Sequence, residues 1–153
     1  MAEGIMKDLV LDEVSLQQRV LPINIASAGI SAEEGRPASR HALSVAAERG
    51  IDLSFHRSRQ LTANIARNSD LILTMSHEHT NYVNRLWPDV SRVCELKQYG
   101  IDSGHVPSDT DIDDPIGSGL EAYREVFDAL YVEIRRVADI LFPFILEKGG
   151  SSE

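Results

Sequence analysis

Asp70-Leu71-Ile72-Leu73-Thr74-Met75 is the most continuous apolar run in the chain. A short apolar run bounded by polar residues is typical of a strand buried on both faces of a parallel sheet. Ser76 follows this run directly and is a suitable N-cap for a helix that ends before Pro88. A buried strand followed at once by a helix predicts an α/β fold.

Helices are expected both before and after this strand in the sequence. Apolar residues at helical spacing predict an amphipathic helix over residues 2–17 and a long helix that starts after Ser118 and is kinked or ended by Pro143. Between them, Pro37 opens a helix that Gly50 stops, and Thr62 caps a short helix.

Two further strands complete the sheet. Residues 21–26 alternate in polarity and lead into the small residues Ser27 to Gly29, and Val93 to Leu96 form a short last strand. The order of elements predicts a three-layer α/β fold with a small parallel sheet flanked by helices. We expect one domain over residues 1–148 and a disordered tail over residues 149–153.

Composition restricts the class of protein. The net charge of −9 and the pI of about 5.0 argue against a general binder of nucleic acid or of anionic membranes. No apolar run approaches the roughly 18 residues of a membrane span, and the first residues lack a signal pattern, so a cytoplasmic location is predicted. The single cysteine, Cys94, excludes an internal disulfide.

The acidic loop Thr110–Gly119 contains the best candidate for chemistry. Pro115 pushes Asp114 out of helical geometry, and Gly117 and Gly119 permit a tight path, so the Asp114 carboxylate can be held in one direction. Asp114 is then either a general acid and base beside the sheet or part of a solvated acidic turn. A calcium loop is excluded because Asp114 stands where glycine is needed and Leu120 where glutamate is needed.

Three other residue groups invite a site. His77-Glu78-His79 suggests a metal, but residues two apart on a helix point in nearly opposite directions, so an exposed helix is favoured and no metal is expected. His56 on its own fits a structural hydrogen bond better than catalysis. Cys94 lacks a glycine-rich cradle, and Gly100 stands six positions on where an arginine is needed, so a structural cysteine is expected.

The chain resembles the low-molecular-weight protein-tyrosine phosphatases, a family that includes bacterial phosphotyrosine and phosphoarginine phosphatases. The resemblance extends over nearly the whole chain and depends on order and spacing. The matching pieces are Met1-Ala2-Glu3, Ser27-Ala28-Gly29, Gly35-Arg36-Pro37-Ala38 with His41-Ala42-Leu43, Gly50 to His56, Arg59-Gln60-Leu61-Thr62, Asp70 to Met75, and Asp114-Pro115.

The resemblance implies roles for three residues. Asp114 would be the general acid and then the base of phosphate hydrolysis, and His56 would support the phosphate-binding loop through hydrogen bonding. Ile116 would form a wall of the substrate site, smaller than the aromatic wall of tyrosine-specific members, so phosphotyrosine and phosphoarginine both stay open as substrates. The expected partner is a phosphorylated protein or phosphoamino acid, with no cofactor.

Family members begin with a strand and a Cys-x5-Arg loop that supplies the nucleophile, and Met1-Ala2-Glu3 matches the residues just after it. We therefore expect the chain to lack that loop and the central first strand, at a cost on the order of 10 kcal/mol of apolar burial, and to be inactive as written. Three interpretations follow: a phosphatase that starts upstream of Met1, a non-catalytic remnant that acts as a binding protein, or an unrelated α/β ligand-binding domain.

Overall fold

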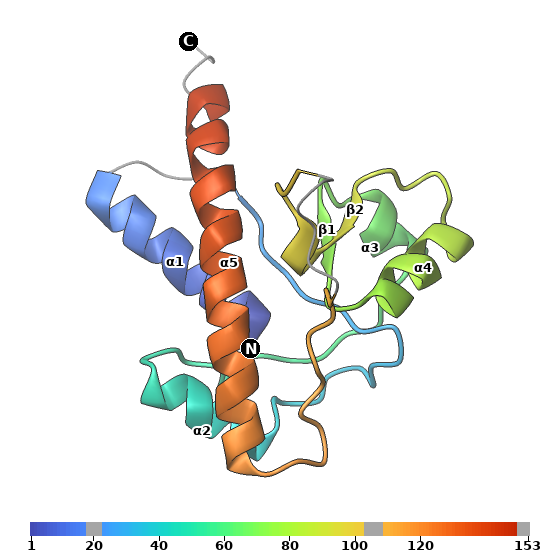
Figure 1. The fold of residues 1–153 in the computed structure, drawn as a ribbon. Coiled ribbons are helices and arrows are strands. Elements are labelled where there is room, and N and C mark those ends of the chain that lie inside the picture. Colours follow the sequence, from blue (N-terminus) through green and yellow to red (C-terminus); the bar gives the residue numbers. More distant parts are fainter. Residues whose placement is uncertain (18–22, 103–108, 150–153) are drawn as a thin grey trace. The chain divides into compact units, whose positions relative to one another are not determined.

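The structure is a computed structural model that describes residues 1–17, 23–102 and 109–149 (Figure 1). The chain divides into two compact units. The helical unit comprises Met1–Ser27, Pro37–His56 and Pro115–Glu153, and the sheet unit comprises Ala28–Arg36 and Arg57–Asp114. No described helix is long and apolar enough to cross a membrane.

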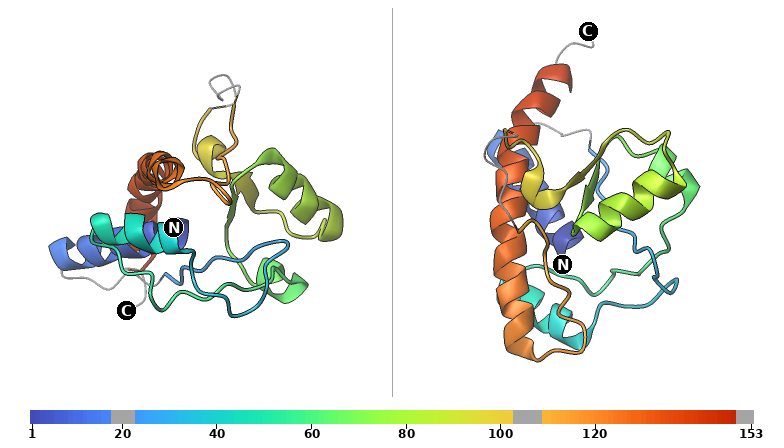
Figure 2. Two further views of the ribbon diagram at one scale, coloured as in Figure 1. Left: turned by 90° about the horizontal axis from the view of Figure 1, so that it is seen from below. Right: turned by 45° about the vertical axis from the view of Figure 1, so that its right-hand side comes forward.

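The helical unit is built on α5 (Leu120–Gly149), against which α1 (Ala2–Gln17) and α2 (Arg40–Glu48) pack. In Figures 1 and 2, α2 lies by the N-terminal end of α5 and α1 lies farther along it. The predicted helix over residues 2–17 is confirmed, and so is the apolar face of the long helix. The buried side chains of α1 and α5 are Ile5, Met6, Leu9, Tyr123, Phe127, Leu130, Ile134, Val137, Ala138 and Phe142.

The start predicted for α2 is wrong, and its end is confirmed. Ser39 is the N-cap, and its side chain accepts a hydrogen bond from Ala42 N, so the helix starts after Pro37. At the other end Gly50 has φ of +78°, and Ile51 N donates to Ala46 O at 2.9 Å. These contacts form the Schellman motif that a glycine after a helix favours.

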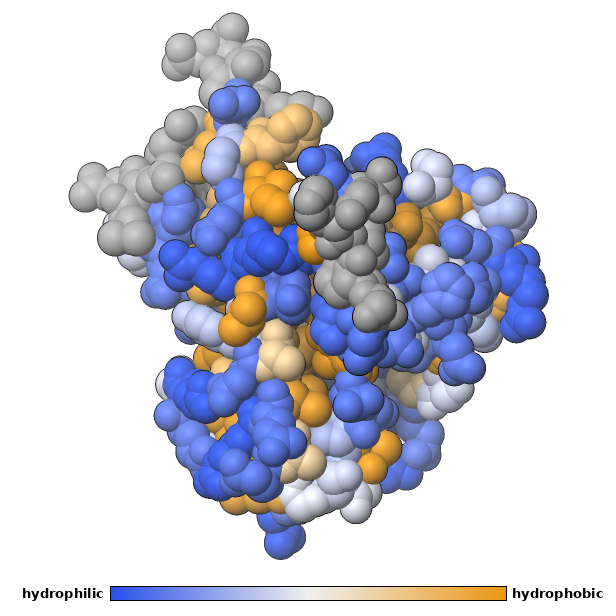
Figure 3. All heavy atoms as spheres, viewed as in Figure 1, coloured by the Kyte–Doolittle hydropathy of each residue, from blue (hydrophilic) through white to orange (hydrophobic). Residues whose placement is uncertain are grey.

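The long helix α5 continues through Pro143 to Gly149, so an end at Pro143 is wrong. Phe142, the residue before the proline, is buried, and this packing offsets the hydrogen bond that proline removes. Residues 150–153 of the predicted tail lie outside the described residues. On the face in Figure 3, apolar atoms reach the surface along α5. The exposed large apolar residues of α5 are Tyr131, Val132, Ile140 and Phe144.

The described part of the sheet unit holds two parallel strands, β1 (Ile72–Thr74) and β2 (Val93–Glu95). Ile72 pairs with Val93 and Thr74 with Glu95, so the carboxyl ends of the two strands lie side by side. The helices α3 (Ala63–Arg67) and α4 (His77–Leu86) and the 3-10 turn η1 (Leu96–Gln98) complete the unit. Thr62 and Ser76 cap α3 and α4, which confirms both predicted helix starts.

The predicted strand over residues 21–26 is wrong for residues 23–26, which form no strand, and residues 21–22 lie outside the described residues. A strand needs a neighbouring strand to bond, and the Ser27 amide instead donates to the Glu3 carboxylate at 2.9 Å. From residue 23 onward, strand-like pairing begins at Gly29, which forms an isolated parallel bridge with Gln60.

Candidate functional site

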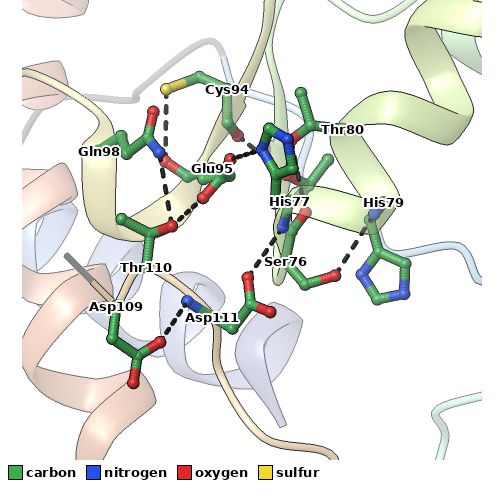
Figure 4. Close-up of polar contacts among 11 residues, drawn as sticks. Ser76, His77, His79, Thr80, Cys94, Glu95, Gln98, Asp109, Thr110 and Asp111 are labelled. Atoms are coloured by element: carbon green, nitrogen blue, oxygen red, sulfur yellow. Dashed lines mark hydrogen bonds and ion pairs between the residues drawn. The ribbon is translucent and has the colours of Figure 1, made fainter. Parts of the chain in front are cut away.

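Residues 109–114, here called the acidic segment, are held to the rest of the sheet unit by hydrogen bonds of their backbone and side chains. Ile112 N donates to Met75 O at 2.8 Å, just beyond the end of β1. Asp111 Oδ1 accepts from His77 N, the first amide of α4, at 2.9 Å (Figure 4). A carboxylate at a helix N-terminus satisfies an amide that has no partner within the helix and interacts favourably with the helix dipole.

Glu95 makes a further connection to the acidic segment. Its side chain is only 3% exposed. The Thr110 hydroxyl donates to Glu95 Oε2, and His77 Nδ1 lies 2.9 Å from Glu95 Oε1. Figure 4 shows the Glu95 carboxylate between His77 and Thr110, and Gln98 also reaches the Thr110 hydroxyl. A buried carboxylate is thereby bonded on both oxygens, as burial of a charge requires.

Asp114 ends the acidic segment and is exposed. Two residues of extended chain span at most about 7 Å, so the Ile112 hydrogen bond limits where Asp114 can lie. Pro115 further excludes helical backbone at Asp114. The neighbouring Asp113 is also exposed. The structure therefore places an exposed Asp114 on a restrained backbone.

Ile116 stands on a four-residue turn at the start of the last segment of the helical unit. Ser118 N donates to Pro115 O at 2.9 Å, and Gly117 has φ of +80°. A positive φ at the third position is the requirement of a type II turn, which glycine meets without strain. Ile116, at the second position, is 77% exposed.

His56 lies beside Glu3 in the first turn of α1, within the helical unit. His56 Nδ1 is 3.6 Å from Glu3 Oε2, which also accepts from Ser27 N at 2.9 Å. Partial burial raises the pKa of Glu3, but hydrogen bonds from Lys7 and Ser27 and the charges of Lys7 and His56 outweigh it, so the pKa lies below its usual value. Glu3 therefore connects the start of α1 to two separate loops.

Comparison with known proteins identifies the family. The family model "Low molecular weight phosphotyrosine protein phosphatase" matches residues 1–142. The chain belongs to this family. The match begins at residue 1, so it lends no support to the expected loss of a first strand and loop.

Individual relatives agree with this assignment. The low molecular weight protein-tyrosine-phosphatase Etp of Escherichia coli (strain K12) is 32% identical over 120 residues, which cover 78% of this chain and 77% of Etp. The protein-arginine-phosphatase of Geobacillus stearothermophilus is 36% identical over 128 residues, 82% of each chain.

The solved structure of YwlE arginine phosphatase from Geobacillus stearothermophilus has a TM-score of 0.79 at 32% identity. The likeness covers 95% of this chain and 86% of that chain, so the fold is that of the family. The interpretation as an unrelated α/β ligand-binding domain is wrong.

The family assignment leaves the predicted site residues in different units. Asp114 belongs to the sheet unit, and His56 and Ile116 belong to the helical unit. Cys94 is half-buried in β2, and its Sγ donates to Glu95 O at 3.3 Å. Among the described residues, no three His, Cys, Asp or Glu side chains form a group that could hold a metal ion.

Sequence reasoning missed the contact between His77 and Glu95. It treated His77 as one residue of an exposed helix, and the His77 side chain is indeed 69% exposed, but Nδ1 still reaches Glu95. The sequence did contain a clue, namely the positions of the two residues. His77 closely follows the first buried strand, and Glu95 ends the next one. The carboxyl ends of neighbouring parallel strands lie at one edge, so these side chains can meet there.

Proposed function

We propose that this chain acts in protein dephosphorylation, on phosphotyrosine or phosphoarginine, with Asp114 as the general acid and base. The observation that supports this proposal is the acidic segment, in which the bonds of the Asp111 side chain and the Ile112 backbone restrain an exposed Asp114. A general acid needs a defined direction toward the leaving atom, and such restraint supplies it.

The proposed reaction has two steps. A cysteine thiolate attacks phosphorus, the bond from phosphorus to the leaving oxygen or nitrogen breaks, and Asp114 gives its proton to the leaving atom. Water then attacks the cysteinyl-phosphate, Asp114 takes a proton from that water, and the thiolate leaves. Asp114 therefore serves as acid in the first step and as base in the second.

The nucleophile of this reaction requires a Cys-x5-Arg loop. The 153 residues contain one cysteine, Cys94, and the residue six positions after it is Gly100. Without an arginine and a ring of amides to hold the phosphoryl oxygens, a thiolate at this position has no stabilised transition state. We infer that the 153 residues alone hydrolyse neither phosphotyrosine nor phosphoarginine.

The other two roles concern support and substrate. His56 is proposed to support the phosphate-binding loop through hydrogen bonding, since it lies beside the first turn of α1, where Met1-Ala2-Glu3 follows that loop in the family pattern. Ile116 is proposed as a substrate wall, because its turn holds an apolar side chain out in solvent. An aliphatic wall of this size leaves both phosphoarginine and phosphotyrosine open as substrates.

The acid role is tested in an extended chain, meaning this sequence preceded by a strand and a Cys-x5-Arg loop of the family pattern. Asp114→Asn should lower kcat on both phosphotyrosine and phosphoarginine by about 10²–10⁴-fold, because the leaving atom loses its proton donor. Asp113→Asn removes the same charge from the adjacent exposed residue and should leave kcat nearly unchanged. Equal losses in the two variants would remove Asp114 from the mechanism.

The inferred inactivity is tested with the 153-residue chain itself. Incubation with both phosphoamino acids should release no phosphate above the blank. Release that disappears in Cys94→Ser would contradict the inference and make Cys94 the nucleophile. Binding of a phosphorylated protein without turnover, even in the extended chain, would instead favour the non-catalytic binding protein.

A further inference from the structure

Glu95 is a buried charged residue whose contacts lead out of the core. Of the described residues, only Thr74 and Glu95 are buried and polar, and they pair with each other across the two strands. Thr74 Oγ1 bonds with Thr80 in α4 at 2.7 Å, which is a neutral contact between neighbouring elements. Glu95 instead bonds with His77 and with Thr110 of the acidic segment.

Three consecutive residues of the acidic segment are fixed to three different elements. The Thr110 hydroxyl donates to Glu95 at the end of β2, the Asp111 carboxylate accepts from the first amide of α4, and the Ile112 amide donates to the residue after β1. Lys97 Nζ also donates to Asp111 O. Bonds in three directions at successive residues leave the segment little freedom to rotate.

The bond to Glu95 differs from the others in its environment. A hydrogen bond to a charged group is stronger than one between neutral groups, and burial keeps water from competing for it. His77 approaches the other oxygen of the same carboxylate, so the carboxylate itself is held in place. Glu95 is therefore a fixed acceptor to which the start of the acidic segment is attached.

We propose that Glu95 is a positioning residue for Asp114 and that it acts through the Thr110 hydroxyl. The inference rests on the role proposed for Asp114. With the Thr110 bond in place, the chain from Thr110 to Ile112 is fixed, and Asp114 follows two residues later. A displacement of the acid by about 1 Å can cost on the order of 100-fold in rate, so a loosened segment lowers the chemical step.

The first test uses the 153-residue chain and amide hydrogen exchange measured by NMR. Thr110→Val removes the donor and should speed exchange of the Ile112 amide about tenfold, as expected for loss of one hydrogen bond to a charged group. Thr110→Ser keeps the hydroxyl and should restore slow exchange. Exchange in the middle of α4 should stay unchanged in both variants. Equal Ile112 exchange in Thr110→Val and the original chain would overturn the proposal.

The second test measures kcat and KM in the extended chain. Thr110→Val and Glu95→Gln should each lower kcat about tenfold with little change in KM, whereas Thr110→Ser should keep kcat. Glu78→Gln is the matched control for charge removal, since Glu78 is exposed in the first turn of α4, and it should have no effect. Full kcat in Thr110→Val, or an equal loss in Thr110→Ser, would overturn the positioning role.

The same assay separates this inference from the proposed function. If Asp114→Asn lowers kcat while Thr110→Val does not, only the positioning role fails. If Asp114→Asn leaves kcat unchanged, the proposed acid itself is wrong, and the positioning role falls with it.

Discussion

Glu3 in the helical unit and Glu95 in the sheet unit have similar neighbours. Each accepts a hydrogen bond from a hydroxyl group, Ser27 for Glu3 and Thr110 for Glu95. Each also lies near a histidine Nδ1, at 3.6 Å from His56 and at 2.9 Å from His77. Both carboxylates thus attach a loop to a helix or strand.

The two sites differ in what the carboxylate holds. Glu3 is 16% exposed, pairs with Lys7 at 2.5 Å and accepts the backbone amide of Ser27. Glu95 is more deeply buried, and its carboxylate bonds with the side chains of His77 and Thr110. Of these, Thr110 also bonds with Gln98, and His77 is exposed to solvent. Glu95 is the more buried of the two, but we expect Glu3 to contribute more to the free energy of unfolding. The desolvation of the buried Glu95 charge offsets the energy of its bonds, whereas the Ser27 amide would lose a charged acceptor if Glu3 were replaced.

The largest effect is expected at Glu3. Glu3→Gln should lower the free energy of unfolding by about 2 kcal/mol, because the charge-assisted bonds to Lys7 and Ser27 are lost or weakened. Urea denaturation followed by circular dichroism measures this change. Asp12→Asn removes a charge from an exposed position of the same helix and should cost far less. Similar losses in the two variants would contradict the role assigned to Glu3.

A loop that uses no carboxylate provides an intermediate case. In the turn from Pro115 to Ser118, Gly117→Ala should destabilise the protein by roughly 1–1.5 kcal/mol, since an L-residue at φ of +80° is strained. An added Cβ would meet no atom within 4 Å, so the cost is conformational alone. Gly119→Ala adds the same atom in open space without a positive φ and serves as the control for the urea midpoint.

Replacing Glu95 is expected to change stability less than replacing Glu3 or Gly117, although Glu95 is more deeply buried than Glu3. Glu95→Leu should change the free energy of unfolding by less than about 1 kcal/mol, because removal of a buried charge recovers its desolvation cost and His77 can turn to water. The single tryptophan, Trp87 in the sheet unit, reports unfolding by fluorescence. A loss larger than that of Glu3→Gln would reverse the ranking of the two sites.

The helices show what the sequence predicts well. The apolar spacing of α1 and α5 indicates both their extent and their buried faces, because helical burial repeats along one chain segment. The start of α2 was misplaced because Pro37 and Ser39 are both suitable near a helix start, and the Ser39 side chain bonds the Ala42 amide. Local sequence patterns therefore predict where helices lie, but they predict the first residue of a helix less accurately.

Contacts between distant segments were not predictable from local patterns. Residues 23–26 have strand-like alternation, but a strand exists only where a partner strand bonds it. Glu95 and His77 are ordinary in their own segments, and the register that pairs Thr74 with Glu95 brings them together. The resemblance to a family singled out His56 and Asp114, whereas the anchors Glu3 and Glu95 emerge only from the folded chain.

The smallest effect concerns the pH dependence of the Glu3 contribution. The pKa of Glu3 is lower in the folded protein than in the unfolded chain, so its ionised form stabilises the fold. This stabilisation is complete above the unfolded value of about 4.5 and is lost as the pH falls through the lower folded value. The difference in unfolding free energy between the original chain and Glu3→Gln should therefore be constant from pH 6 down to about 5 and shrink below about 4.5. A difference that grows on acidification would show that the neutral form of Glu3, and not the carboxylate, holds Ser27.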